Sequence, residues 1–260
     1  MRPRLLLVLS ACAIGLHAQA PVLPFAPGER LIFDVKVGLF GTLGRSAMWI
    51  EGPTERRGTA AWLLRFDLDA SRGPVRATDR TSSWFDPVRG ASLRYEKTER
   101  YLLAKRAERV EIDPLRREWR PDSGALQTSP SDRPLDELSF IYFVRTLPLA
   151  LDSTYRFERH FDSARNPTFV RVHKRETITT RAGTFATLAV EMRVRGGSHY
   201  EKEGTVLLNL SDDAARTPIR MISKMPVIGT VTLLLAERHE GARTESSIGR
   251  SPTVNPEGNP

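Results

Sequence analysis

The sequence predicts a mainly β protein: one large curled antiparallel sheet, an open or partly closed barrel, with one short buried helix near residues 134–146. Apolar and polar residues alternate with a period of two through most segments after residue 28, which is the pattern of half-buried strands. Gly, Pro, Asn and Asp separate these segments at short intervals, as in antiparallel sheets. So many strands usually curl or close to hide their edges.

The first twenty residues, MRPRLLLVLSACAIGLHAQA, have the three parts of a secretory signal peptide. Arg2 and Arg4 form the charged region, residues 5–16 form the apolar region, and Ala18-Gln19-Ala20 is an A-x-A cleavage site. We therefore predict an exported protein, in the periplasm or at the periphery of the outer membrane, whose mature chain begins at Pro21. The mature chain is predicted to be one β-rich domain over residues 21–240, followed by a disordered Gly-, Ser- and Pro-rich tail at 241–260.

Cys12 offers an alternative, because Leu9-Ser10-Ala11-Cys12 fits the cleavage pattern of a lipoprotein. The chain would then be anchored to a membrane through Cys12. This is the only cysteine, so cleavage after Ala20 would leave no residue for disulfides or thiolate metal sites. No other segment is long and apolar enough to predict a transmembrane span.

The formal net charge of the chain is +8, and removal of Arg2 and Arg4 lowers it to +6. The remaining Arg residues are interleaved with Asp and Glu, which indicates a solvated and mildly cationic surface. Such a surface weakly favours anionic partners such as lipid headgroups. The dilution of the basic residues and the predicted export argue against nucleic acid.

Four strands are expected from alternation alone, over residues 30–38, 62–69, 185–194 and 205–210. In the first of these, Leu31, Phe33 and Val35 share one face. Residues 154–162 also alternate, and this pattern places Glu158, His160 and Asp162 on an exposed polar face. Residues 71–83 lack large apolar side chains and are either an exposed edge or a strand that faces a wet interior.

The helix is predicted where alternation is lost, in DELSFIYFVRTLPL at residues 136–149. Pro134, Asp136 and Glu137 suit its first turn, Arg145 its last turn, and Pro148 its end. A short helix that is apolar nearly all round is usually buried on several sides. It either closes the open side of the sheet or forms a lid over an apolar cavity, and the two are compatible.

The chain has no G-x-S-x-G, no H-E-x-x-H, no phosphate loop and no dinucleotide fingerprint, so we predict no catalytic residue, metal or cofactor. The scattered histidines favour polar surface positions over a metal site. One ligand hypothesis remains, in which Arg145, Arg220 and Lys224 point into the concave side of the sheet and hold an anionic headgroup. Tyr142 would contribute to the same site from the helix.

Four stretches together resemble a bacterial family of uncharacterised envelope proteins, domain of unknown function 3108. They are PGERLIFDVKVGLFGTLG, DELSFIYFVRTLPL, ETITTRAGTFATLAV and LSDDAARTPIRMISKMPVIGTVTLLL, in the order of the family. The resemblance implies an exported β-rich protein without an assigned activity or catalytic residues. One departure is Asp152, where the family would have glycine. By fold alone, the predicted sheet and helix are also analogous to periplasmic lipoprotein carriers.

Three functions from different classes follow. The first is a non-enzymatic envelope protein whose curled sheet binds an apolar or amphipathic molecule, such as a lipid, or a partner protein. The second is a structural or assembly factor with a solid core, and the third is an enzyme acting on envelope glycans. A cavity beneath the helix would favour the first, a filled interior the second, and converging carboxylates in a cleft the third.

Overall fold

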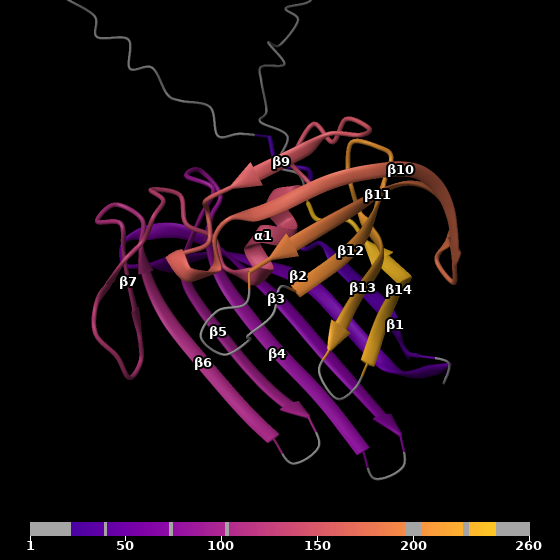
Figure 1. The fold of residues 1–260 in the computed structure, drawn as a ribbon, viewed down its shortest axis with the longest axis horizontal. Coiled ribbons are helices and arrows are strands. Elements are labelled where there is room, and N and C mark those ends of the chain that lie inside the picture. The colour runs from indigo at the N-terminus through magenta and orange to yellow at the C-terminus, as the bar shows by residue number, and fades with distance from the viewer. Residues whose placement is uncertain are drawn as a thin grey trace, which may run out of the picture.

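The computed structural model describes residues 22–38, 41–72, 75–101, 104–195, 204–225 and 229–242. The predicted signal peptide, Cys12 and nearly all of the predicted tail lie outside these residues, so those predictions stay untested. The described residues form one antiparallel sheet of fourteen strands that does not close, and it curls around one α-helix (Figure 1). The strands are β1(Arg30–Val37), β2(Thr42–Arg56), β3(Thr59–Arg72), β4(Val75–Asp86), β5(Ala91–Tyr101), β6(Ala104–Asp113), β7(Glu118–Pro121), β8(Gln127–Thr128), β9(Thr154–Phe157), β10(Thr168–Thr180), β11(Gly183–Val194), β12(Gly204–Ser211), β13(Pro218–Met225) and β14(Gly229–His239); the helix is α1(Glu137–Val144), and η1(Ser163–Arg165) is a single 3-10 turn.

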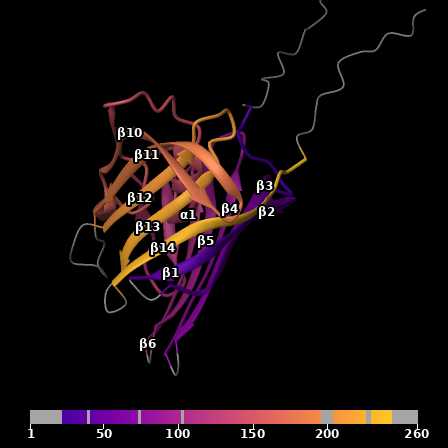
Figure 2. The ribbon, with the colours of Figure 1, turned by 90° about the vertical axis from the view of Figure 1, so that its right-hand side faces the viewer.

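The strand order across the sheet is β8-β7-β6-β5-β4-β3-β2-β1-β14-β13-β12-β11-β10-β9. The chain therefore builds outward from β1 to β8, crosses the interior through α1, and returns from β9 to β14, which pairs with β1. Figure 2 shows β1 and β14 side by side. The predicted fold class, a curled antiparallel sheet with one short helix, is confirmed.

The long hairpin of β10 and β11 bends strongly over the neighbouring strands (Figures 1 and 2). Arg181, in the turn of this hairpin, lies 3.7 Å from the Asp34 carboxylate of β1 and 3.1 Å from that of Glu237 of β14. The turn of this hairpin thus reaches β1 and β14, the paired strands in the middle of the sheet.

The side chains that alternate inward fill the concave side of the sheet. The predicted inner residues Leu31, Phe33 and Val35 are at most 2% exposed. They join one continuous core with residues of α1 and with the inner faces of β2, β3 and β10–β14. Close packing of this kind is the usual state of a protein interior.

Helix α1 begins and ends inside the predicted range, and both of its ends are fixed by polar groups. Asp136 is the N-cap, accepts from the backbone N–H groups of Leu138 and Ser139, and forms a capping box with Ser139. Ser83 of β4 donates to the same Asp136 carboxylate, and Ser92 of β5 accepts from the Asp136 N–H. The start of α1 is therefore anchored to β4 and β5.

Two other sequence-based predictions have clear outcomes. Residues 75–86 form β4, a central strand, so of the two predictions for 71–83 the exposed edge is wrong. Asp152 has φ of 61°, a left-handed conformation that suits the glycine expected from the family resemblance. No helix in the described ranges is long and apolar enough to cross a membrane.

The expectation for residues 154–162 is wrong in its second half. Strand β9 ends at Phe157, and His160 is 3% exposed, so it does not lie on a solvated strand face. The chain turns inward there because Leu135 and His160 form an isolated parallel bridge, with backbone bonds from Leu135 N–H to the Arg159 carbonyl and from Phe161 N–H to the Leu135 carbonyl. Alternation alone did not reveal this pairing, because its two segments lie far apart in the sequence.

Candidate functional site

The structure brings together two of the four residues predicted to bind a ligand, Tyr142 and Arg145. Both lie at the C-terminal end of α1 and are at most 1% exposed. The Tyr142 ring packs edge-on against the Phe25 ring with 4.9 Å between centroids, and the Arg145 guanidinium lies 5.0 Å from the centre of the Phe25 ring. The two residues thus belong to the packed interior.

Arg145 is held by Glu29, a residue of the segment before β1. Its two terminal nitrogens donate to the two Glu29 carboxylate oxygens at 2.7 Å each, a bidentate ion pair. One of these nitrogens also donates to the Ala215 carbonyl at 3.2 Å. Arg145 therefore ties the end of α1 to the N-terminal segment and to the loop between β12 and β13, and its strongest donors are already used.

Arg220 and Lys224 do not join this pair, and the prediction that they point into the concave side is wrong. Along β13 the buried residues Ile219 and Met221 face the core, and Arg220 and Lys224 occupy the alternate positions on the outer face. Arg220 donates there to Asn209 at 2.8 Å and to Glu176 at 3.0 Å. The four residues therefore form no single site.

The geometry instead identifies a charged cluster in the concave face, formed by Asp79 of β4, Tyr95, Lys97 and Glu99 of β5, and Glu137 of α1. The Lys97 ammonium lies 2.6 Å from Glu99, 3.3 Å from Glu137 and 3.7 Å from Asp79. The Tyr95 hydroxyl donates to Glu137 at 2.7 Å. Asp79 and Glu99 are each 5% exposed, whereas the side chains of Lys97 and Glu137 are 18% and 32% exposed. The charged cluster is therefore buried at Asp79 and Glu99 and partly open to water at Glu137.

Burial and charge act in opposite directions on the groups of the charged cluster. Burial alone would lower the pKa of Lys97, but the carboxylates of Glu137, Asp79 and Glu99 raise it well above its ordinary value. Burial alone would raise the pKa of Glu137, but Lys97, Arg165 and the Tyr95 hydroxyl bring it well below its usual range. Lys97 is therefore a permanent cation and Glu137 a permanent anion at neutral pH.

Asp79 behaves differently from the other acids of the charged cluster. Burial raises the pKa of Asp79 to about 6, which Lys97 and the Thr81 hydroxyl only partly oppose and which Glu99 and Glu137 reinforce. Thr81 donates to its carboxylate at 2.7 Å. Asp79 is thus the member of the charged cluster that changes its protonation state near physiological pH.

Arg165 and His160 extend the charged cluster toward η1. Arg165 forms an ion pair with Glu137, and its guanidinium lies 3.3 Å from Nε2 of His160. Burial and the charge of Arg165 lower the pKa of His160 to about 3, so its ring is neutral at physiological pH. The ring accepts the Asp162 backbone N–H at Nδ1, so His160 is a buried structural residue and not a member of the exposed polar face expected from the sequence.

The carboxylates of the charged cluster converge on an ammonium group inside the protein and not on an open cleft. Such an arrangement holds α1 against β5 through Glu137. Over the described ranges, no three His, Cys, Asp or Glu side chains are grouped so that they could hold a metal ion. The observed chemistry is that of an internally compensated ion network.

The sequence held a signal for this charged cluster. Asp79, Thr81 and Ser83 alternate along β4, and Tyr95, Lys97 and Glu99 alternate along β5, so each set lies on one strand face. The wet interior considered for residues 71–83 is therefore close to the observed arrangement. The period of two defines the two faces of a strand but not which of them is buried, and this left the charged cluster undetected.

We predict that Asp79→Asn removes a pH dependence of stability. The folded-state pKa of about 6 lies above the ordinary 3.8, so the unfolded chain loses this proton first as the pH rises. Between about pH 4 and 6, the free energy of unfolding of the wild-type protein should fall by roughly 3 kcal/mol relative to that of Asp79→Asn. Above about pH 6 this difference should not grow further. Urea melts across this range measure it, with Asp122→Asn, whose side chain is 55% exposed, as the control. Parallel curves for wild type and Asp79→Asn would contradict the assignment.

A curled antiparallel sheet wrapped around one capped helix places the protein among β-rich, barrel-like folds. The chain belongs to the family described as "Protein of unknown function (DUF3108)", which matches residues 32–236. The family resemblance proposed from the sequence is thereby confirmed. No curated protein matches the chain.

Solved structures resemble the chain at low sequence identity. A beta-barrel-like protein of domain of unknown function DUF1849 from Brucella abortus is 11% identical, with a TM-score of 0.52 over 82% of this chain and 97% of that chain. A protein from Bacteroides fragilis described as a "putative exported protein with YmcC-like fold" is 10% identical, with a TM-score of 0.32 over 84% of this chain and 98% of that chain. At these identities the first likeness concerns the fold alone.

Proposed function

We propose that the protein is an exported, non-enzymatic protein of the bacterial cell envelope that acts through its surface, as a structural or assembly factor, and not as an internal carrier. One observation supports this most strongly: α1 packs against the concave side of the sheet as part of its core. Leu138, Phe140, Tyr142 and Val144 are each at most 4% exposed and pack into the core formed by the sheet. A carrier would need room there for an apolar molecule.

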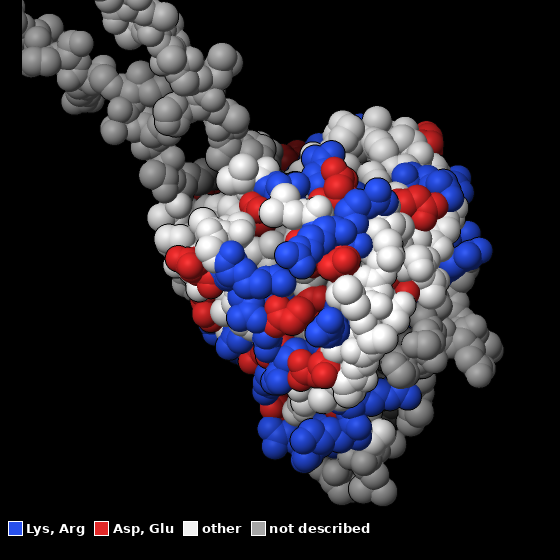
Figure 3. All heavy atoms as spheres, turned by 90° about the vertical axis from the view of Figure 1, so that its left-hand side faces the viewer, with Lys and Arg blue, Asp and Glu red and all other residues white. Residues whose placement is uncertain are grey.

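The polar parts of the interior are equally occupied. The charge of Arg145 is compensated by Glu29, and that of Lys97 by three carboxylates, so neither offers a free charge to a headgroup. The hollow beside Glu29 has a volume of about 20 Å³, room for about one water molecule. On the outside, basic and acidic side chains are interleaved over the face shown in Figure 3, as expected of a solvated surface that contacts partners.

The experiment is export of the full chain in a bacterial host, followed by titration of the purified mature protein with a fluorescent lipophilic probe. We expect a periplasmic product that begins at Pro21 and shows no saturable probe uptake, with a periplasmic lipoprotein carrier as the positive control. A product that begins with lipid-modified Cys12 would instead make it a membrane-anchored lipoprotein. Stoichiometric uptake that is weakened by Tyr142→Ala would overturn the solid-core function and establish α1 as a lid.

A further inference from the structure

Two hairpin turns at one end of the sheet share an Asp-Pro-aliphatic-Arg pattern and the same geometry. The β4–β5 turn reads Asp86-Pro87-Val88-Arg89-Gly90, and the β6–β7 turn reads Asp113-Pro114-Leu115-Arg116-Arg117. In each, the aspartate carboxylate accepts the backbone N–H groups of the third and fourth residues, at 2.9 to 3.1 Å. The fifth residue is left-handed in both, with φ of 69° at Gly90 and 56° at Arg117.

This geometry places an aliphatic side chain and an arginine at the tip of each turn. Val88 is 66% exposed and Leu115 is 77% exposed, the largest such values among the described large hydrophobic residues after Val22. The Arg116 side chain is 76% exposed. A single exposed aliphatic residue needs no explanation, but a matched aliphatic–arginine pair on two neighbouring turns does.

The two turns belong to one continuous surface, at the upper-left end of β4, β5 and β6 in Figure 1. The segment 130–134 connects them, because Arg117 donates to the Pro130 carbonyl at 2.7 Å and Ser92 N–H donates to the Pro134 carbonyl at 2.8 Å. Arg159 joins the same segment to the first turn, since it donates to the carbonyls of Arg133 and Gly90. We call this region the turn surface and define it by Val88, Arg89, Leu115, Arg116, Arg117, Arg133 and Arg159.

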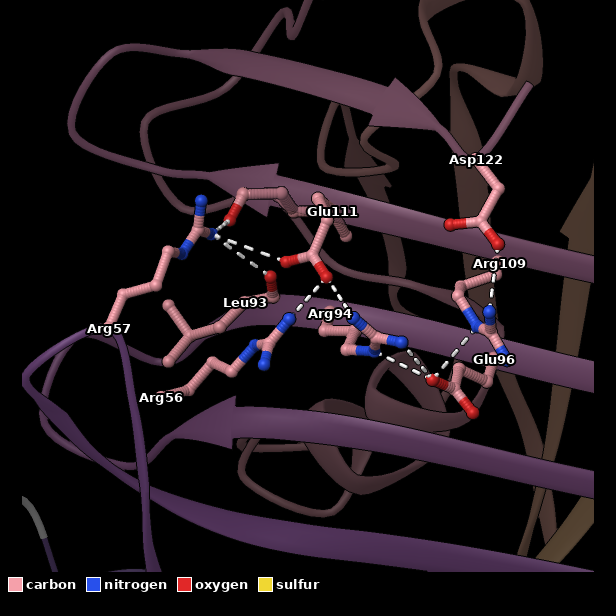
Figure 4. A network of polar contacts seen from close by, with 9 residues as sticks. Arg56, Arg57, Leu93, Arg94, Glu96, Arg109, Glu111 and Asp122 are labelled. Atoms are coloured by element: carbon pink, nitrogen blue, oxygen red, sulfur yellow. Dashed lines mark hydrogen bonds and ion pairs between the residues drawn. The ribbon is translucent and has the colours of Figure 1, made fainter. Parts of the chain in front are cut away.

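The cations of the turn surface differ from the arginines just beside them. On the outer face, Glu111 binds Arg56, Arg57 and Arg94, as Figure 4 shows. Glu96 binds Arg94 and Arg109 in the same network, so that part of the face is neutralised.

In the described part of the chain, by contrast, no carboxylate lies within ion-pair distance of Arg89, Arg117, Arg133 or Arg159. Arg133 and Arg159 moreover repel each other, and the exposed Asp132 offsets this only in part. The turn surface therefore combines two protruding aliphatic tips with the guanidinium groups of Arg89, Arg117, Arg133 and Arg159, which have no ion-pair partner among the described residues. Arg116 has only a long contact, at 3.9 Å, with the carboxylate of Asp113 in its own turn.

We propose that the turn surface binds an anionic lipid bilayer, with Val88 and Leu115 inserted at the level of the headgroups and the arginines paired with lipid phosphates. This inference rests on the proposed function, because a protein of the cell envelope has such a surface within reach. The aliphatic tips favour a bilayer over a soluble polyanion, since only a bilayer removes them from water. The arginines supply the attraction to anionic headgroups.

The test is co-sedimentation of the purified mature protein with phosphatidylcholine vesicles that contain or lack phosphatidylglycerol. Wild type should bind only the anionic vesicles, and more weakly at high salt. Val88→Ser with Leu115→Ser should weaken binding about tenfold, and Arg89→Gln with Arg116→Gln by roughly fivefold per charge. The matched controls, which should bind like wild type, are Leu151→Ser with Leu207→Ser and Arg100→Gln with Arg171→Gln.

Equal binding by wild type and the serine pair would overturn the proposal, and so would equal loss in the test and control pairs. If only Arg89→Gln with Arg116→Gln weakened vesicle binding, and the wild-type protein were also retained on heparin resin, the arginines would be assigned to a soluble polyanion. That result would also overturn the proposal. Vesicle binding by purified protein does not depend on export or on the solid core. Failure here therefore leaves the proposed function to its own experiment.

Discussion

Arg145→Met should lower the free energy of unfolding by about 3–5 kcal/mol, because it leaves the Glu29 carboxylate buried without its counter-charge. The exposed fraction is 0% for the Arg145 side chain and 9% for that of Glu29, and the pair is bidentate at 2.7 Å. The loss should also free the end of α1 from the β12–β13 loop, which Arg145 reaches through the Ala215 carbonyl. Urea melts of purified wild type and variant measure the difference.

Two further variants isolate the cause. Arg220→Met removes an arginine whose side chain is 28% exposed and is paired with Glu176, so its cost should be about 1 kcal/mol or less. Combining Glu29→Leu with Arg145→Met removes both charges together and should recover much of the stability lost in Arg145→Met alone. If Arg145→Met cost no more than Arg220→Met, the ion pair would not hold α1 in place.

The fold class and α1 could be predicted from the sequence, but the role of Arg145 could not. The fold class was accessible because period-two alternation is local, and α1 was accessible because Asp136, the aromatic run and Pro148 lie within one short stretch. The role of Arg145 was not, because its partner Glu29 lies 116 residues away. A lone arginine in an apolar helix therefore resembled a free ligand-binding group.

The outward position of Arg220 and the charged cluster were missed for two different reasons. The alternation of Ile219, Arg220 and Met221 already placed Arg220 opposite the apolar face, so its outward position could have been read from the sequence. The polar faces of β4 and β5 carry no such mark, because a buried compensated network and a solvated strand face share the same pattern. Only the ion pairs of Glu137 with Lys97 and Arg165 distinguish the two cases.

The second large effect concerns the aromatic residues of α1. Phe140 is 4% exposed and packs against Phe143 and Phe157 with ring centroids 5.6 and 6.0 Å away. Phe140→Ala should lower the free energy of unfolding by about 3–5 kcal/mol, because the loss of a buried ring leaves a cavity. Phe143 is only partly buried and carries the Arg159 guanidinium 4.3 Å from its ring centre, so Phe143→Ala should cost less.

Phe169 of β10, which is 38% exposed, provides the matched control, and Phe169→Ala should change the melt little. Tyr142→Phe completes the set, because the Tyr142 hydroxyl is buried without a hydrogen-bond partner among the described residues. Its removal should leave stability unchanged or slightly higher. If Phe140→Ala and Phe169→Ala melted alike, α1 would not be part of the core, and a lid or partner-binding role would replace the solid interior. If Tyr142→Phe were strongly destabilising, the Tyr142 hydroxyl would have a buried hydrogen-bond partner in the folded protein, and its assignment as unpaired would be wrong.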